Sequence, residues 1–345
     1  RGAFDPRADL HVVASRAYLG PGVWFLGGIA DQLGGRVSGQ ATLSGDLESV
    51  RIRGSVDGRD LRAYAMPIGI AHSNLVANAD LRTLQWSLGF PAVRTRVGGG
   101  QLVGEIFLKS NVRGGVDLSS RWKTRRVDFF RLSNQLGRSS SLARGEISGE
   151  LSLRGKSVKT LEDLAGRFDF KLGQTKGAAI PGLTAASQFL GPLSLATQSF
   201  DTGEAKGIVG QGVIVIDEFW IGSGSALVQA DGKVFLQSGR MDLNALIATG
   251  NYLDVAANFA EIAQQYALRT LIPASAILSV SELLRDRTLV LAVSGTMRNP
   301  IVRLRPVETF REEAVRFLLR EGQRLIVAGV ASGAVDGIDG WDGAF

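Results

Sequence analysis

Residues 200–247 read FDTGEAKGIVGQGVIVIDEFWIGSGSALVQADGKVFLQSGRMDLNALI, and this stretch decides the expected fold. It predicts four short strands separated by glycine-containing turns, at 212–216, 218–221, 226–230 and 234–236. Asp231-Gly232 lies between two apolar runs and predicts a tight hairpin, because both turn residues tolerate positive φ. We therefore expect a sheet built from successive hairpins, with no catalytic centre in this stretch.

The same pattern extends over most of the chain. Turn signals recur about every 8 to 12 residues, which is typical of all-β proteins. A second Asp-Gly pair, at 57–58, predicts another hairpin. Further strands are expected at 9–15, 37–43, 50–56, 61–66, 68–72, 75–79, 84–90, 102–108, 116–122, 147–153, 167–172, 288–297 and 301–305.

Apolar residues at helical spacing predict a smaller number of helices. The stripe of Val255, Phe259, Ile262 and Tyr266 is the clearest signal, and Pro273 and Pro306 each suit the first turn of a following helix. The expected helices cover residues 23–33, 128–136, 161–165, 181–190, 253–268, 274–285 and 307–331.

Composition narrows the possible chemistry. The 345 residues include 44 glycines, two histidines and no cysteine, and 45% are hydrophobic. The lack of cysteine excludes disulfides, a thiol nucleophile and a cysteine-ligated metal. His11 and His72 stand alone in strand-like settings and offer little for a catalytic triad. Asp217 and Glu218 are adjacent in a strand and face opposite ways. We expect no enzyme activity, no catalytic residue, no metal and no cofactor.

The formal net charge is +6, and the basic residues are mostly dispersed. Their densest cluster contains Arg121, Lys123, Arg125 and Arg126. This cluster either contacts the phosphate of lipid headgroups or is a solvated strand end, which is the simpler interpretation. Because no basic-aromatic stripe continues from it, nucleic acid is not an expected partner.

Targeting signals are lacking in the sequence itself. No apolar run approaches the roughly 18 residues of a membrane span, and no signal peptide is recognisable. The chain begins with Arg1, so we expect a segment of a longer protein with its targeting element upstream.

The C-terminal half resembles a known family. Residues 289–302 contain Gly295-Thr296 and Pro300 after an apolar strand, which resembles the closing element of the AsmA-like C-terminal region. The segment GSALVQADGKVFLQSGRMDLNALI resembles a hairpin of the same family, with Ala230 where a second glycine is usual. IPGLTAASQFLG also fits. The resemblance covers roughly residues 144–306 and rests mainly on glycine, proline and apolar patterning.

The resemblance to envelope proteins of the AsmA, TamB and YhdP type implies a fold and a function. The implied fold is mainly β with peripheral helices: an elongated, curved antiparallel sheet that forms an open apolar groove and is capped by C-terminal helices. The implied function is non-enzymatic lipid transfer, in which phospholipid acyl chains move along the groove towards the outer membrane. The implied location is the periplasm, with an anchor in the inner membrane outside this chain, and envelope proteins are possible partners.

Strand alternation selects the residues expected on the inner wall of such a groove, because every second side chain faces the same way. The expected lining residues are Ile147, Leu151, Leu153, Phe168, Phe170, Val213, Val215, Val234, Leu236, Leu289, Leu291 and Val293.

The sequence and the resemblance together divide the chain into four expected segments. These are an N-terminal β-groove at 1–127, an AsmA-like region at 128–306, an amphipathic helix at 307–331 and a flexible tail at 332–345.

An alternative function remains open. The same apolar residues could fill the closed core of a structural β-scaffold or an adhesive surface protein. A repetitive solenoid would show a fixed repeat period, and this sequence shows none. The two hypotheses differ in one physical respect: lipid transfer requires apolar surface that stays accessible, whereas a scaffold requires that surface to be filled.

Overall fold

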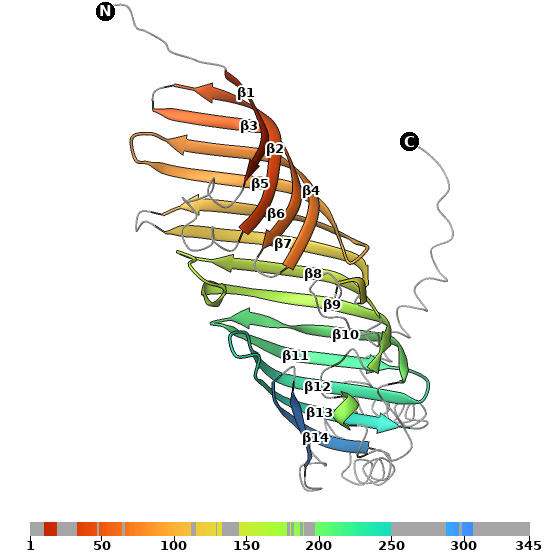
Figure 1. The fold of residues 1–345 in the computed structure, drawn as a ribbon. Coiled ribbons are helices and arrows are strands. Elements are labelled where there is room, and N and C mark those ends of the chain that lie inside the picture. The colour runs from red at the N-terminus through yellow and green to blue at the C-terminus, as the bar shows by residue number, and fades with distance from the viewer. Residues whose placement is uncertain are drawn as a thin grey trace, which may run out of the picture.

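A computed structural model describes residues 10–18, 33–46, 48–63, 66–111, 115–128, 130–132, 145–177, 180, 183–186, 189, 197–249, 288–296 and 299–305. Within these residues, fifteen strands form one antiparallel sheet in which each strand pairs with its neighbours in the sequence. Figure 1 shows the strands stacked in chain order, with β1 and β14 far apart. The expectation of a mainly β, open antiparallel sheet is confirmed.

Most strands are nine residues or longer. They are β1 (Leu10–Tyr18), β2 (Leu33–Gly45), β3 (Ser49–Ala63), β4 (Met66–Asp80), β5 (Gln85–Val97), β6 (Gly100–Ser110), β7 (Val116–Asp128), β8 (Glu146–Gly155), β9 (Leu164–Lys176), β10 (Ser199–Gly210), β11 (Val213–Gly222), β12 (Ala226–Phe235), β13 (Met241–Thr249), β14 (Thr288–Gly295) and β15 (Pro300–Leu304). The sheet is continuous across the expected boundary at 127/128, since β7 pairs with β8.

Two hairpin predictions are wrong. Asp57-Gly58 lies inside β3 and Asp231-Gly232 lies inside β12, so neither pair forms a turn. Each glycine instead permits close packing, because a Cβ on Gly58 would clash with the side chain of Leu61 and one on Gly232 with the carbonyl oxygen of Asp242. The four short strands expected at 212–236 therefore form two long strands. Glycine inside a strand can mark such a close approach as readily as a turn.

Helix is scarce in the described part of the chain. A 3₁₀ turn at Leu161–Asp163 matches the single turn expected there, and α3 (Leu183–Ala186) lies within the helix expected at 181–190. Residues 130–132 are helical within the segment expected at 128–136. The helices expected at 23–33, 253–268, 274–285 and 307–331 and the tail at 332–345 lie wholly or almost wholly outside the described residues.

Cross-strand register divides the sheet into two chemically different faces. We call one the apolar face; from β2 to β15 it carries Ala41, Ile52, Ala77, Leu88, Ile106, Trp122, Leu151, Phe168, Ala205, Ile216, Ala230, Ala245, Leu291 and Val302. The opposite, polar face carries Thr42, Arg53, Asn78, Ser87, Glu105, Arg121, Ser152, Arg167, Lys206, Lys233 and Asp242. Where β12, β13 and β14 pair, this face also carries the buried apolar residues Leu227, Leu246, Ala248 and Val290.

Glycines on the apolar face bring neighbouring backbones unusually close. A Cβ on Gly54, Gly166 or Gly207 would clash with the carbonyl oxygen of Gln40, Ser152 or Val215 on the adjacent strand. In each strand, the residues two positions before and two positions after the glycine face the same way as the glycine, and they are apolar. Close approach on one face lets the sheet bend toward that face.

Two apolar clusters show the consequence of this bending. One joins Leu108, Val116, Val158 and Leu164, and Leu33 at the start of β2 packs against it although β2 is four strands away from β6. The other lies between β9 and β15 and includes Phe200, Ile221, Ile247 and Leu291, each with no exposed surface. The contact between Leu33 and the first cluster shows that the apolar face curls inward in the N-terminal half, where residues such as Ile52, Ala77 and Trp122 are half-buried. In the C-terminal half α3 also covers it.

Aspartate carboxylates stabilise the tight turns that join the strands at one end of the hairpins. Asp46 accepts hydrogen bonds from the backbone N–H groups of Glu48 (2.9 Å) and Ser49 (2.7 Å). Asp80 and Asp163 accept equivalent pairs in the turns before β5 and β9. Asp117 accepts from the Asn111 amide and the Ser157 N–H, both at 2.9 Å, and so links two turns.

These hydrogen bonds lower the pKa of each carboxyl group. The N–H of Ser49 is the main cause for Asp46, that of Thr83 for Asp80 and that of Lys159 for Asp163. For Asp117 the main cause is the Asn111 amide. Hydrogen bonds to the ionised form favour that form.

We predict that replacing one glycine of β9 destabilises the sheet and replacing another does not. Gly166→Ala places a methyl group against the Ser152 carbonyl, so the free energy of unfolding falls by about 1–3 kcal/mol. Gly173→Ala, in the same strand, is the control because nothing lies within 4 Å of its Cβ position. Urea unfolding measures both. Equal losses would contradict the close-approach argument.

We also predict acid sensitivity that originates in the turns. Each of these four carboxyl groups has a lower pKa in the folded state than in the unfolded state, where it is about 3.9. Their contribution to stability is complete above that value and is lost as the pH falls through the folded-state pKa values. Urea unfolding as a function of pH should show a shallower acid dependence for Asp46→Asn/Asp80→Asn/Asp117→Asn/Asp163→Asn. An unchanged acid dependence would contradict this assignment.

Candidate apolar binding site

An apolar pocket of about 290 Å³ lies on the apolar face between β9 and β14. Strands β11, β12 and β13 form its floor, and Leu183 and Ala186 of α3 form part of its wall. Figure 1 shows α3 in front of this part of the sheet. The lining residues are Phe168, Ile180, Leu183, Ala186, Ala205, Ile214, Ile216, Phe219, Val228, Ala230, Val234, Met241, Leu243, Ala245, Ile247, Leu291 and Val293.

Every lining side chain is apolar, and the lining residues differ in how deeply they are buried. Ile247 and Leu291 have no exposed surface, whereas Phe168 and Val234 are only partly buried. The ring of Phe168 stacks on that of Phe170 at 5.7 Å between centroids, which extends the aromatic surface along β9. The pocket can therefore accept an apolar ligand by burying hydrocarbon, and its side chains offer no charge or hydrogen bond.

Nine of the twelve expected lining residues lie on the apolar face. Phe168, Val234, Leu291 and Val293 line the pocket. Ile147 and Leu289 pack against the cluster that contains Phe200 and Leu291, and Leu153 packs against the cluster around Leu108 and Val116. Leu151 pairs with Phe168, and Phe170 pairs with Ala205. That these residues line a lipid groove stays a prediction.

The other three lie elsewhere. Val213 and Val215 are on the polar face, opposite Gly210 and Ile208, so Ile214 and Ile216 take the inward positions of β11. A register shift between Ile216 and Phe219 then keeps Phe219 on the apolar face. In the run Val213–Ile216 all four residues are apolar, so periodicity cannot assign their faces. Leu236 follows the end of β12 and is 38% exposed.

Sequence reasoning also missed most of the pocket floor. Met241, Leu243, Ala245 and Ile247 alternate along β13, and this period-2 pattern was available in the sequence. The small residues Ala205 and Ala230 carry no such signal. Their place in the pocket follows from the register of β10 and β12 with their neighbours.

The basic cluster of β7 is mostly paired with carboxylates on the polar face. Lys123 Nζ lies 2.7 Å from Glu150 Oε1, and this contact lowers the pKa of Glu150. Arg121 pairs with Glu105 at 3.7 Å and Arg126 with Glu146 at 3.4 Å. Arg125 forms no ion pair with a described residue. Of the four expected headgroup contacts, three are thus already bound within the protein.

Some titratable groups elsewhere in the described chain also form pairs. His72 Nδ1 lies 2.8 Å from Asp57 Oδ1, and both side chains are more than half exposed. Lys206 Nζ lies 2.7 Å from Glu204 Oε1, and that hydrogen bond raises the pKa of Lys206. The described residues contain no group of three or more His, Asp or Glu side chains suited to a metal ion.

Comparisons with known proteins add no relative: no protein-family model, curated protein or solved structure matches this chain. Among the described residues, no helix has the length and apolar character to cross a bilayer.

We predict that the pocket floor contributes strongly to stability. Leu291→Ala removes a fully buried side chain and lowers the free energy of unfolding by about 2–5 kcal/mol. Leu304→Ala is a matched control, because Leu304 pairs with Leu291 across the two strands but is 50% exposed. Leu304→Ala should lower the free energy of unfolding much less. Similar losses in urea unfolding would contradict the assigned burial.

Proposed function

We propose that the protein is a non-enzymatic lipid-binding and lipid-transfer protein of the bacterial cell envelope. The observation that carries the proposal is the pocket of about 290 Å³, lined by apolar side chains, on a sheet that stays open. Each acyl CH₂ removed from water gains about 0.8 kcal/mol. The acyl chain of a phospholipid is therefore the ligand class that best fits this site.

The organisation of the sheet supports transfer along its length. The apolar face continues from β2 to β15 in one sheet, so adjacent strands present apolar side chains side by side. We infer that an acyl chain moves along this face while its headgroup stays in water, and that phospholipid is carried towards the outer membrane. An anchor in the inner membrane and contacts with other envelope proteins belong to the same proposal.

Uptake of an acyl chain requires no covalent step. No general acid, general base or nucleophile is needed, and the side chains around the pocket supply none. The function we propose is accordingly binding and release.

A structural β-scaffold is the second candidate, and one observation favours it. In the N-terminal half, the cluster around Leu108 and Val116 is filled by the protein's own side chains, including Leu33 from β2. A sheet that is filled along its whole length would serve as a scaffold. Lipid transfer requires side chains in this cluster to separate when an acyl chain passes.

The proposal predicts that lipid crosslinks to one face only. A photoreactive benzoylphenylalanine replaces Phe219 in the pocket or Trp220, the next residue on the opposite face. After purification from a phospholipid-containing host and irradiation, mass spectrometry should detect a phospholipid adduct at position 219 and none at 220. Equal adducts at both positions, or none at either, would contradict the proposal.

A second prediction tests the pocket by filling it. Ala205→Trp places a large side chain in the pocket and should reduce the phospholipid that co-purifies with the protein. Ala165→Trp, on the exposed side of β9, is the control and should leave bound lipid unchanged. Thermal unfolding checks that both variants are folded. Undiminished lipid in folded Ala205→Trp would argue for a scaffold.

A further inference from the structure

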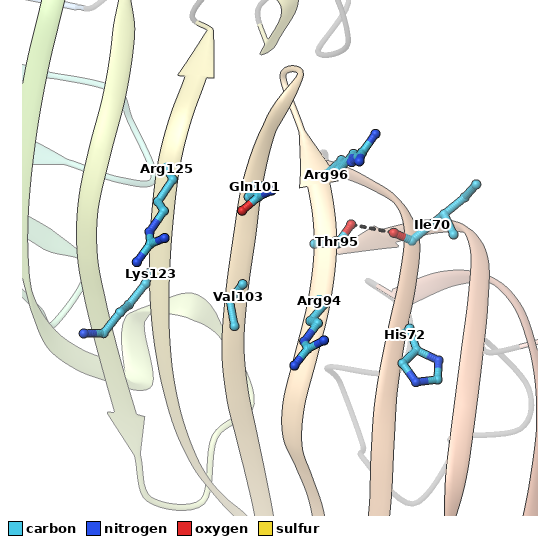
Figure 2. Close-up of a pocket in the computed structure, with 9 residues that line it drawn as sticks. All are labelled: Ile70, His72, Arg94, Thr95, Arg96, Gln101, Val103, Lys123 and Arg125. Carbon is cyan, nitrogen blue, oxygen red and sulfur yellow. Dashed lines mark hydrogen bonds between the residues drawn. The ribbon is translucent and has the colours of Figure 1, made fainter. Parts of the chain in front are cut away.

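A second pocket lies on the polar face, near the hairpin that joins β5 to β6. It has a volume of about 840 Å³ and is formed by four adjacent strands, β4 to β7. Figure 2 shows the side chains that line it: Ile70, His72, Arg94, Thr95, Arg96, Gln101, Val103, Lys123 and Arg125. Five of these nine carry or can carry a positive charge, and none is acidic.

Strand register arranges the basic groups in two rows. Arg96, Gln101 and Arg125 are cross-strand partners in one row. Arg94, Val103 and Lys123 form the next row. Figure 2 shows the two rows at successive levels below the hairpin tip. Because adjacent strands lie about 4.8 Å apart, the backbones of Arg96 and Arg125 lie about 10 Å apart on either side of Gln101. Figure 2 shows both arginine side chains extended away from Gln101, so contact with one small anion requires them to turn towards it.

Three of these cations lack a carboxylate partner among the described residues, as do Arg51 and Arg53 elsewhere on this face. Lys123 is bound to Glu150 and His72 to Asp57, and Arg36, Arg82, Arg121 and Arg126 also form ion pairs. Within the described residues, Arg94, Arg96 and Arg125 form none. Arg94 and Arg96 lie two residues apart on β5 and Arg125 lies two strands away on β7, so their like charges repel one another. An anion bound between them would relieve that repulsion.

The pocket is held in shape by a buried hydroxyl. Thr95 is 7% exposed, and its Oγ1 lies 2.8 Å from the carbonyl oxygen of Ile68 and 2.7 Å from that of Ile70. These contacts fix β4 against the end of β5, beside the positive-φ residue Gly69. Arg94 and Arg96 therefore project from a fixed backbone, which reduces the entropy lost on binding.

We propose that this pocket binds a phosphate group through Arg94, Arg96 and Arg125, with Gln101 as an additional donor. The planar guanidinium group matches phosphate oxygens with two parallel hydrogen bonds. The phosphate belongs to a phospholipid headgroup or to a soluble phosphate compound. Exposed Ile70 (71%) and Val103 (43%) lie beside the cations and would contact the apolar part of an amphiphilic ligand. This site is on the opposite face from the acyl-chain pocket and does not depend on it.

The test measures binding of two probes to the whole chain. Calorimetry with glycerol 3-phosphate reports soluble phosphate, and co-sedimentation with phosphatidylglycerol-containing vesicles reports headgroups. Arg96→Gln/Arg125→Gln should lower the affinity for whichever probe binds by at least about tenfold, since charge-assisted hydrogen bonds are lost. Arg51→Gln/Arg53→Gln removes the same charge from β3, elsewhere on the polar face, and should change binding less than twofold.

Each outcome decides the proposal. If Arg96→Gln/Arg125→Gln loses affinity for glycerol 3-phosphate and Arg51→Gln/Arg53→Gln does not, the pocket is a soluble phosphate site. If the same difference is seen only with vesicles, the pocket is a headgroup site. Equal weakening by both double variants would show that only overall charge matters and would overturn the proposal. Failure of both probes to bind would overturn it as well. Lipid adducts at position 219 should persist in Arg96→Gln/Arg125→Gln, so this result is separable from the acyl-chain function.

Discussion

Close contact between neighbouring backbones at glycines of the apolar face is the constraint on which the structure depends. At Gly54, Gly166 and Gly207 a side chain would occupy the space of a carbonyl oxygen on the next strand. An ordinary residue at each position would push the strands apart on that face. Because the glycines share one face, the sheet can bend in one direction without breaking its hydrogen-bond ladder. The bent sheet then buries apolar side chains that a flat sheet would leave in water.

The two faces differ in how much apolar surface they remove from water. On the apolar face, curling and α3 bury residues such as Val93, Ile247 and Leu291. On the polar face, exposed side chains form ion pairs such as Lys123 with Glu150, and exposed pairs of this kind contribute little to stability. We infer that the apolar face supplies most of the stabilising burial, to which Leu246 and Val290 on the other face add at the C-terminal end. Towards the N-terminus the polar face carries charge, including Arg94, Arg96 and Arg125, which form no ion pair with a described residue.

Much of the architecture could be predicted from the sequence. Clean alternation at 147–153 and 167–172 gave the correct faces for β8 and β9, because apolar and polar residues take turns there. Val213 and Val215 lie on the polar face and not on the expected inner wall, because a run of four apolar residues carries no period that would assign their faces. Asp57-Gly58 and Asp231-Gly232 predict turns but lie inside β3 and β12, because the sequence does not show whether a glycine reverses the chain or allows a neighbouring strand to approach closely. The pocket with Arg94, Arg96 and Arg125 depends on register between strands, which no local pattern contains.

Intrinsic tryptophans allow the most direct test of the central claim, that the apolar face takes up acyl chains beyond the pocket itself. Trp122 lies on the apolar face of β7 and Trp220 on the polar face of β11. In single-tryptophan variants, a phospholipid with a nitroxide on its acyl chain should quench Trp122 strongly and Trp220 little. Equal quenching of the two, or none of Trp122 while lipid is bound, would contradict the account.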